Sequence, residues 1–203
     1  METFLAPVER PKNLLMKLFY AFFQSSFGKV ITPLKVHSAR MPVSFFLHYI
    51  KTYSLEKKLK VGEETALLVR EMVSRQNGCL FCMDAHRFAT VAMKGLKECR
   101  DKLEALIEYQ SSPLFSEAER TMLDYVCELT RKKKVEPETF ARMGSYWTER
   151  EICEIVWLVA TEHMNSMTNL GLNIHSDMLC DLALKNRKAN RSEKSAGTRF
   201  SNI

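Results

Sequence analysis

The 203-residue sequence has few glycines and prolines, seven of the former and six of the latter. Sandwiches and barrels need many turns, and turns depend heavily on these two residues. Residues that favour helices, such as leucine, methionine, alanine, glutamate and lysine, are plentiful instead. No segment alternates apolar and polar residues for long enough to require a strand. The sequence therefore predicts an all-α protein.

The sequence also lacks a long run of apolar residues. Residues 14–23 are rich in them, but Lys17 interrupts this stretch, and it is too short to cross a bilayer. The first residues do not have the basic segment followed by an apolar run that marks a signal peptide. We therefore expect no membrane partner and a cytoplasmic location.

Cysteine is present, but not in the pattern of a secreted protein. Only two of the six cysteines are close together in the sequence, so they do not form the spaced framework of a disulfide-rich domain. In a reducing compartment, a pair of cysteines two residues apart is more often catalytic or metal-binding than structural.

The net charge of +6 comes almost entirely from one end of the chain. Residues 185–203 contain six Lys or Arg and one Glu, which gives +5 of the +6. This segment has no apolar periodicity, so we expect a flexible basic tail after a single helical domain at residues 1–184. The domain itself is nearly neutral, which argues against a nucleic-acid partner.

Redox chemistry is indicated where Cys79 and Cys82 follow an Asn77-Gly78 turn and His86 comes four residues later. On a helix, the three positions fall on one narrow face, so two thiols and an imidazole share it. Asn-Gly favours a helix entrance, so we expect Cys79 in the first turn. Unpaired backbone N–H groups and the helix dipole stabilise a thiolate there.

Capping signals and apolar spacing set the other expected helices. Ser116 and Thr148 each begin a capping box, and Gly95 is placed to end the cysteine helix. Prolines at positions 33 and 42 indicate an irregular stretch between the first two helices. We expect helices over residues 13–23, 43–59, 63–75, 79–94, 97–109, 116–132, 137–143, 148–172 and 176–184.

The motif after the apolar helix at residues 63–75 resembles a known family. Asn77-Gly78-Cys79-Leu80-Phe81-Cys82-Met83-Asp84-Ala85-His86 is similar to the core of the alkylhydroperoxidase D-like, carboxymuconolactone decarboxylase superfamily. The likeness extends over residues 35–180, includes the core motif at residues 63–95 and is strongest at residues 67–95. Segments 114–120 and 147–152 are similar to linking segments of its longer, peroxidase-related members.

The resemblance implies an alkylhydroperoxidase D-like helical bundle with the CxxC at a helix N-terminus. It also implies homo-oligomers such as trimers or hexamers, and thiol-dependent peroxidase or disulfide reductase chemistry in antioxidant defence. By that likeness, Cys82 is the nucleophile, Cys79 is the resolving thiol and His86 belongs to a proton relay.

Two positions depart from the family pattern. The relay usually includes a glutamate twelve residues before the first cysteine, and this chain has Leu67 there. Glu71 and Glu64 lie one helical turn away on either side, and Glu71 is our preferred substitute. The residue before the second cysteine, a histidine in the best-known peroxidase branch, is Phe81. With fewer ionisable groups, we expect disulfide exchange to outweigh peroxidase activity.

Peroxide reduction requires a thiolate that attacks the O–O bond and a second thiol that condenses with the resulting sulfenic acid. The substrate would be a small hydroperoxide or disulfide. His86 could accept the proton of Cys82 directly or through one water. An outside dithiol must then reduce the Cys79–Cys82 disulfide, which implies a thioredoxin-like or lipoyl-bearing partner. No GxGxxG motif follows a strand, so we expect no cofactor.

Other interpretations of the motif remain open. Cys79, Cys82 and His86 could be zinc ligands, with Cys99 or a water as the fourth, in a non-enzymatic interaction module. A carboxymuconolactone decarboxylase-type enzyme would rely on histidine and arginine instead of a thiol pair. A c-type haem needs histidine where Met83 stands. We favour the thiol enzyme with no bound metal.

Three polar residues further along the chain are less informative. His163, Asn165 and Asn169 could line a pocket or an interface. A stripe of satisfied polar side chains on a packed helix is the interpretation we favour for them.

Overall fold

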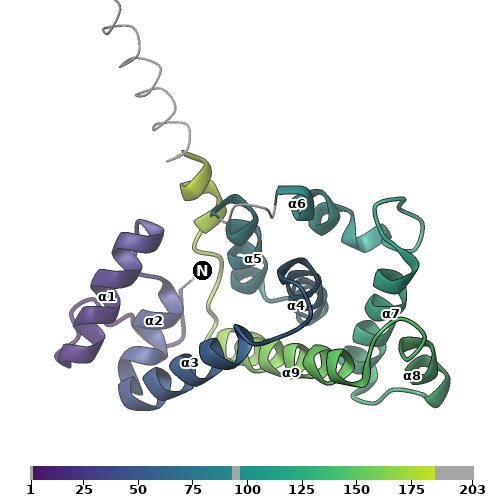
Figure 1. Ribbon diagram of the computed structural model, residues 1–203. Coiled ribbons are helices and arrows are strands. Elements are labelled where there is room, and N and C mark those ends of the chain that lie inside the picture. Colours follow the sequence, from purple (N-terminus) through teal and green to yellow (C-terminus); the bar gives the residue numbers. More distant parts are fainter. Residues whose placement is uncertain (1, 93–96, 186–203) are drawn as a thin grey trace, which may run out of the picture.

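The computed structural model describes residues 2–92 and 97–185, and its elements are drawn in Figure 1. Within those residues every regular element is a helix, which confirms the all-α prediction. In chain order they are α1 (Leu14–Phe27), α2 (Thr32–Val36), the 3-10 helix η1 (Ser38–Arg40), α3 (Pro42–Glu56), α4 (Glu63–Asn77), α5 (Leu80–Ala92), α6 (Lys97–Glu104), the 3-10 helix η2 (Ala105–Glu108), α7 (Glu117–Lys132), α8 (Pro137–Met143) and α9 (Glu149–Gly171).

The two capping boxes form as the sequence predicts. The Ser116 hydroxyl accepts from the backbone N–H of Glu119, and the Glu119 carboxylate accepts from the backbone N–H of Ser116. Thr148 and Glu151 make the same reciprocal pair at the start of α9. Each cap satisfies helix N–H groups that have no partner within the helix, which stabilises the helix by about 1 kcal/mol.

Three local predictions need correction. The stretch between the first two long helices contains α2 and η1, because Pro33 occupies a first-turn position where its missing N–H costs nothing. The helix predicted over residues 43–59 ends at Glu56. The last described helix covers residues 179–185 and not 176–184, because Met178 has a φ of 56° and cannot continue a helix. Gly95 and the basic tail beyond residue 185 lie outside the described residues.

The main core surrounds α4, which packs against α5, α7 and α9 (Figure 1). Its fully buried side chains include Leu68 of α4, Leu123 of α7, and Ile155 and Leu158 of α9. Burying each such side chain contributes about 1.5–3 kcal/mol relative to leaving it exposed. This core fixes α4 and α9 side by side, and both helices supply polar groups to the site described below.

A second, smaller core holds the cysteines. Cys79, Phe81 and Cys82 lie in a buried cluster with Val36, Ile174 and Leu179, so residues after α9 fold back over the start of α5. Asp84 of α5 fixes that return: its carboxylate accepts from the Ser176 hydroxyl and from the backbone N–H groups of residues 179 and 180. The fold therefore encloses the CxxC pair.

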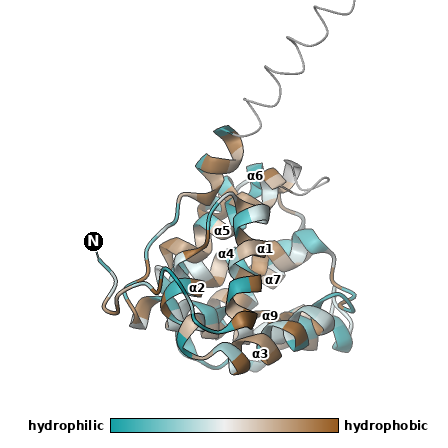
Figure 2. Cartoon of the chain, turned by 90° about the vertical axis from the view of Figure 1, so that its left-hand side faces the viewer, coloured by the Kyte–Doolittle hydropathy of each residue, from teal (hydrophilic) through white to brown (hydrophobic). Residues whose placement is uncertain are grey.

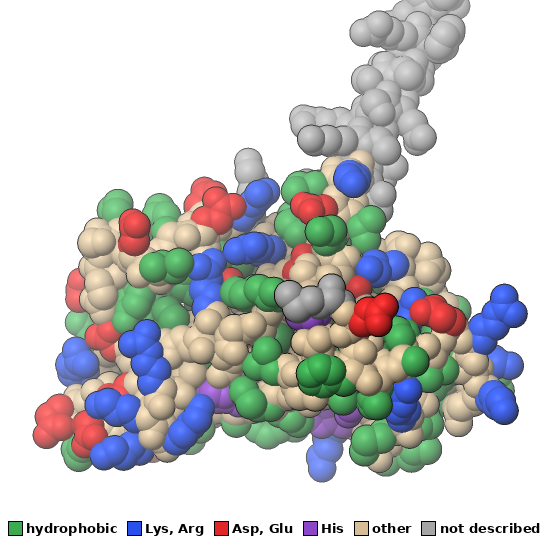
Figure 3. Space-filling view, turned by 180° about the vertical axis from the view of Figure 1, so that it is seen from behind, with side chains coloured by type: hydrophobic (Ala, Val, Ile, Leu, Met, Phe, Trp, Pro, Cys, Tyr) green, Lys and Arg blue, Asp and Glu red, His purple; other side chains and the backbone are tan. Residues whose placement is uncertain are grey.

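The surface carries both signs of charge. In the view of Figure 3, Lys and Arg side chains are interspersed with Asp and Glu over the face of the molecule. Among the described residues, no helix is long and apolar enough to cross a membrane.

Candidate active site

The CxxC pair sits where α4 ends and α5 begins. Gly78 adopts a φ of 72°, a conformation that glycine reaches without strain, and it turns the chain between the two helices. The Cys79 backbone N–H donates to the Ser74 carbonyl at 2.9 Å, which closes the end of α4. Cys79 and Cys82 are joined as a disulfide.

Cys79 lies one residue before α5 and not within its first turn. Its Sγ accepts a hydrogen bond from the Cys82 backbone N–H at 3.3 Å, so the sulfur fills the N-cap role that a serine or aspartate oxygen usually has. Negative charge on this sulfur would be favoured by the helix N-terminus. The thiolate-stabilising location that the sequence predicted is therefore present, displaced by one residue.

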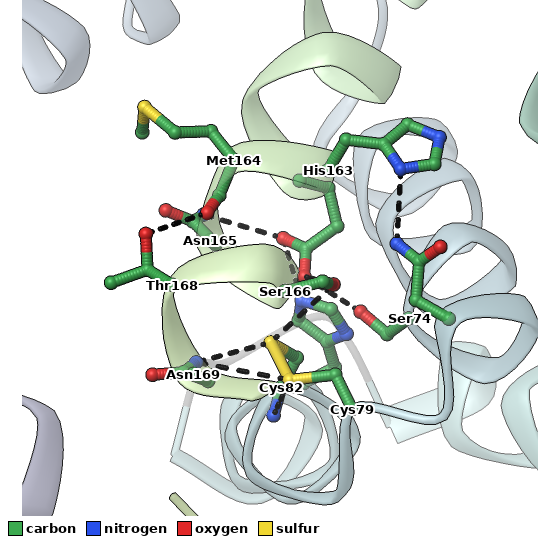
Figure 4. Close-up of a disulfide and its surroundings, with 12 residues drawn as sticks. Ser74, Cys79, Cys82, His163, Met164, Asn165, Ser166, Thr168 and Asn169 are labelled. Carbon is green, nitrogen blue, oxygen red and sulfur yellow. Dashed lines mark hydrogen bonds and ion pairs between the residues drawn. A yellow bond between two sulfur atoms is a disulfide. The ribbon is translucent and has the colours of Figure 1, made fainter. Parts of the chain in front are cut away.

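Helix α9 supplies a hydrogen-bond donor to both sulfurs (Figure 4). Asn169 Nδ2 lies 3.4 Å from Cys82 Sγ and 3.7 Å from Cys79 Sγ. The Ser166 hydroxyl lies 3.8 Å from Cys82 Sγ. Both sulfurs are nearly enclosed, because Cys79 is 1% and Cys82 4% exposed. In such a low-dielectric environment, a directed amide donor stabilises a thiolate more than it would in water.

His86 lies between two buried carboxylates. Its Nδ1 is 3.1 Å from Glu71 Oε2, and its Nε2 is 3.7 Å from Glu162 Oε2. Burial by itself would lower the pKa of His86, but hydrogen bonds and charge from Glu162 and Glu71 outweigh it and raise the pKa to about 9. Burial opposes ionisation of Glu162, yet its contact with His86 keeps the pKa of this carboxyl below its ordinary value. The two carboxylates therefore favour the imidazolium form of His86 at neutral pH.

Glu71, predicted as the relay carboxylate, is fully buried beside His86. Its second oxygen accepts from Arg75 Nε at 2.8 Å, and Arg75 Nη2 donates to the Leu103 carbonyl at 2.7 Å. The alternative, Glu64, instead pairs with Lys102 at 2.7 Å at the surface.

Our sequence reasoning missed Ser166 and also Glu162, a buried carboxylate of α9. Besides His86, it contacts the Ser74 hydroxyl at 2.7 Å and the Ser166 hydroxyl at 3.5 Å, both through Oε1. A chain of polar contacts thus runs from Cys82 Sγ to Ser166, then to Glu162, and then to His86. One signal could have found both: residues 162, 166 and 169 are polar at helical spacing, so they share one face of the helix.

The three polar residues noted on this helix have different positions. Asn169 contacts the sulfurs, and Asn165 Nδ2 donates to Glu162 Oε2 at 3.4 Å, so both belong to the site. His163 does not: its Nδ1 faces Asn77 Nδ2 at 3.1 Å on another side of α9. The interpretation of this group as a structural stripe stays a prediction for His163, whereas Asn165 and Asn169 contact residues of the candidate site.

A cavity of about 190 Å³ opens beside Cys82. Cys82, His86 and Glu162 line it, whereas Cys79 does not. Its wall combines apolar side chains with amide and hydroxyl groups, namely Pro33, Phe81, Ala85, Asn165, Thr168 and Asn169. A small substrate in this cavity would meet Cys82 before Cys79.

The zinc alternative lacks support in the geometry. Among the described residues, no group of three or more His, Cys, Asp or Glu side chains is arranged to hold a metal ion. Cys99, considered as a fourth ligand, is buried in the main core with the Leu67 side chain and away from the CxxC cluster. Burial raises the pKa of its thiol to about 12.

Comparison with known proteins bears on the fold. No family model matches the sequence. The uncharacterized protein YnjA of Escherichia coli K12 is 24% identical over 161 residues, which is 78% of this chain and 86% of that protein. The name of that protein states no activity.

Solved structures match nearly the whole chain. A variant of the debrominase Bmp8 in complex with 2,3,4-tribromopyrrole superposes with a TM-score of 0.72 at 18% identity, over 92% of this chain and 98% of that one. An alkylhydroperoxidase D core, the uncharacterized peroxidase-related protein from Ralstonia eutropha JMP134, gives 0.68 at 16% identity, over 88% and 97%. The predicted resemblance is thus confirmed in three dimensions, and this chain has the alkylhydroperoxidase D-like helical fold, with its CxxC at the start of a helix.

Proposed function

We propose that this protein is a thiol-dependent oxidoreductase that reduces small hydroperoxides or disulfides, with Cys82 as nucleophile and Cys79 as resolving thiol. One observation carries the proposal: Cys82 faces a cavity that His86 and Glu162 also line, and its sulfur is within bonding reach of Cys79. A reactive thiol needs substrate access, a donor that stabilises the thiolate and a partner thiol. This arrangement supplies all three.

The reaction proceeds in three balanced steps. The Cys82 thiolate attacks the outer oxygen of the hydroperoxide, the O–O bond breaks, and the leaving alkoxide takes a proton to become an alcohol. The Cys79 thiol then attacks the Cys82 sulfenic acid, which forms the disulfide and releases water. A dithiol donor reduces this disulfide through a mixed disulfide and leaves in its own oxidised form. With a disulfide substrate, the first step is thiol exchange.

The proton path runs through Ser166 and Glu162. From the sequence we proposed that His86 accepts the Cys82 proton directly or through one water; the raised pKa of His86 favours its protonated form, so we propose Glu162 as the first acceptor instead. Glu162 would receive the Cys82 proton through the Ser166 hydroxyl. The His86 imidazolium, which lines the same cavity, then supplies the proton that the leaving alkoxide needs.

Two buried carboxylates change the expected balance of activities. We had expected disulfide exchange to outweigh peroxidase activity because Leu67 replaces the relay glutamate of the family and Phe81 replaces a histidine. Glu71 and Glu162 both contact His86, so the relay does not lack acidic groups. We therefore propose hydroperoxide reduction as a principal activity beside disulfide reduction, in antioxidant defence.

The electron donor must reach a nearly enclosed disulfide. A dithiol carried on a narrow, flexible arm, as on a lipoyl-bearing protein, would enter such a site most easily, and a thioredoxin-like protein is the alternative. Either donor requires a reducing compartment, which supports the proposed cytoplasmic location.

The experiment is an activity assay with dihydrolipoamide as donor. Reduction of an alkyl hydroperoxide and of a model disulfide should be abolished in Cys82→Ser and Cys79→Ser, and lowered in a pH-dependent manner in His86→Ala. Cys153→Ser, which removes an exposed free thiol, is the matched control and should retain full activity.

Full activity in both CxxC variants would refute the thiol mechanism and favour decarboxylase-type chemistry. The brominated pyrrole bound by Bmp8 serves as an additional substrate. Cys82-dependent release of bromide without hydroperoxide reduction would assign reductive dehalogenation instead.

We also propose that the protein forms a homo-oligomer, such as a trimer or hexamer, through its N-terminal helices. No residue of α3 is buried, although Val43, Leu47, Ile50 and Tyr53 are large and apolar, and all four are exposed. Figure 2 shows α3 at the bottom of the view, with hydrophobic (brown) stretches along it. An exposed apolar surface of this kind is typical of an interface. Leu47→Glu should reduce the mass measured by light scattering, whereas Lys51→Glu should reduce it less. An unchanged mass in Leu47→Glu would reject this interface.

A further inference from the structure

The structure contains a second cavity, which lies apart from the one beside Cys82. It measures about 440 Å³ and takes its walls from α4, α5, η2 and α7. None of its lining residues lines the cavity beside Cys82. Most of the wall is apolar or sulfur-bearing and includes Met72, Met83, Leu106, Ile107 and Cys127. Unbranched methionine side chains adapt to ligands of different shapes.

Two guanidinium groups line this cavity, and no carboxylate is among the described residues that do. They belong to Arg75 of α4 and Arg131 of α7. Arg75 already donates to Glu71 and to the Leu103 carbonyl, which accounts for two of its five N–H donors. Arg131 donates through Nε to Gln76 Oε1 and has no carboxylate partner in the described part of the chain. The cavity therefore combines an apolar wall with the positive charge of Arg131, which pairs with no carboxylate of the described residues, and with the remaining N–H donors of Arg75.

We propose that this cavity binds an organic anion with an apolar body, such as a medium-chain carboxylate. The carboxylate would accept charge-assisted hydrogen bonds from Arg131 and Arg75, whose planar donor groups suit two oxygens. The chain of the ligand would lie against Met72 and Met83, where water is displaced from apolar surface. An uncharged molecule of the same shape would gain the apolar contacts with Met72 and Met83 but not the charge-assisted hydrogen bonds.

The test is a titration of the oxidised, full-length protein with octanoate, followed by NMR of the methionine methyl groups. Signals of Met72 and Met83 should shift and saturate, whereas those of Met164 and Met167, exposed on α9, should stay in place. Octanol should bind about 100-fold more weakly, because it loses the charge-assisted contacts with both Arg131 and Arg75 and each contact is worth roughly tenfold.

Two substitutions test which positive charge binds the carboxylate of octanoate. Arg131→Gln should weaken octanoate binding about tenfold without affecting octanol, since Arg131 is exposed and neutral glutamine keeps part of the side chain. Lys134→Gln is the control, because it removes an equal surface charge outside the cavity. Equal binding of octanoate and octanol, unshifted Met72 and Met83 signals, or unchanged affinity in Arg131→Gln would each overturn the proposal. None of these results depends on the thiol activity.

Discussion

Replacing Glu162 by glutamine keeps the size of the side chain but removes the charge that faces His86 Nε2. In the native protein the pKa of His86 is about 9 instead of 6.5, a difference worth on the order of 3 kcal/mol in favour of the imidazolium. Two carboxylates supply this stabilisation against the cost of burial, so the loss of one should lower the pKa of His86 toward 6.5.

Two kinetic effects should follow in Glu162→Gln. Because Glu162 is the proposed acceptor of the Cys82 proton, kcat/KM for an alkyl hydroperoxide should fall roughly 100-fold at neutral pH, as expected for the loss of a general base. Because the imidazolium is the proposed proton donor, activity of the native enzyme should decline as pH rises through about 9. In the variant, this decline should begin at a lower pH.

The matched control is Glu154→Gln, the same substitution on the same helix. Glu154 is also buried, but it accepts from the backbone N–H groups of Lys60 and Val61 and pairs with Arg150, far along α9 from the sulfurs. It should lower stability and leave the pH profile unchanged. If Glu162→Gln lowered kcat/KM without moving the alkaline decline, Glu162 would not act on His86 and the proposed relay would be wrong.

Three further outcomes are expected. The folded-state pKa of His86 exceeds its unfolded value, so its stabilisation is complete below pH 6.5 and is lost as pH rises through about 9. Denaturant unfolding should therefore lose on the order of 3 kcal/mol over that window, and much less in His86→Gln. Asp84→Ala should destabilise the fold by about 1–3 kcal/mol, since three donors of segment 176–180 lose their acceptor, whereas exposed Asp101→Ala should have little effect in the same melt. In the reduced protein, Asn169→Ala should shift the alkylation of Cys82 by iodoacetamide to higher pH, because the thiolate loses the amide donor of Asn169; an unchanged pH profile would exclude Asn169 as a donor to the thiolate.

Local signals predicted most of the helices. The capping boxes at Ser116 and Thr148 fixed two helix starts to the residue, and Pro137 with Met143 bounded α8 as expected. These signals succeed because a helix end satisfies its free N–H groups with side chains only a few residues away. Predictions were less accurate at residues 176–178, just before Leu179, because the Ser176 hydroxyl and the Leu179 backbone N–H both donate to Asp84, which is distant in sequence.

The candidate site likewise has a part that local sequence signals predict and a part that depends on distant contacts. The alignment of Cys79, Cys82 and His86 could be predicted because one helix positions all three. Glu71 could be proposed because it lies on the preceding helix near the right face. The contribution of α9, with Glu162 and Asn169, depends on how two distant helices pack, and neither spacing nor composition determines that packing.

The relay differs from the family pattern in where its carboxylates come from, and the charges explain why this arrangement can be buried. Glu71 and Glu162 carry two negative charges, and the His86 imidazolium and the Arg75 guanidinium carry two positive ones. An unpaired buried ion costs several kcal/mol, whereas a neutral group of four, each in contact with an opposite charge, avoids that cost. Arg75 is thus the partner that allows two carboxylates to share one histidine. Since Arg75 also lines the second cavity, an anion bound there would compete for the charge that holds Glu71 beside His86.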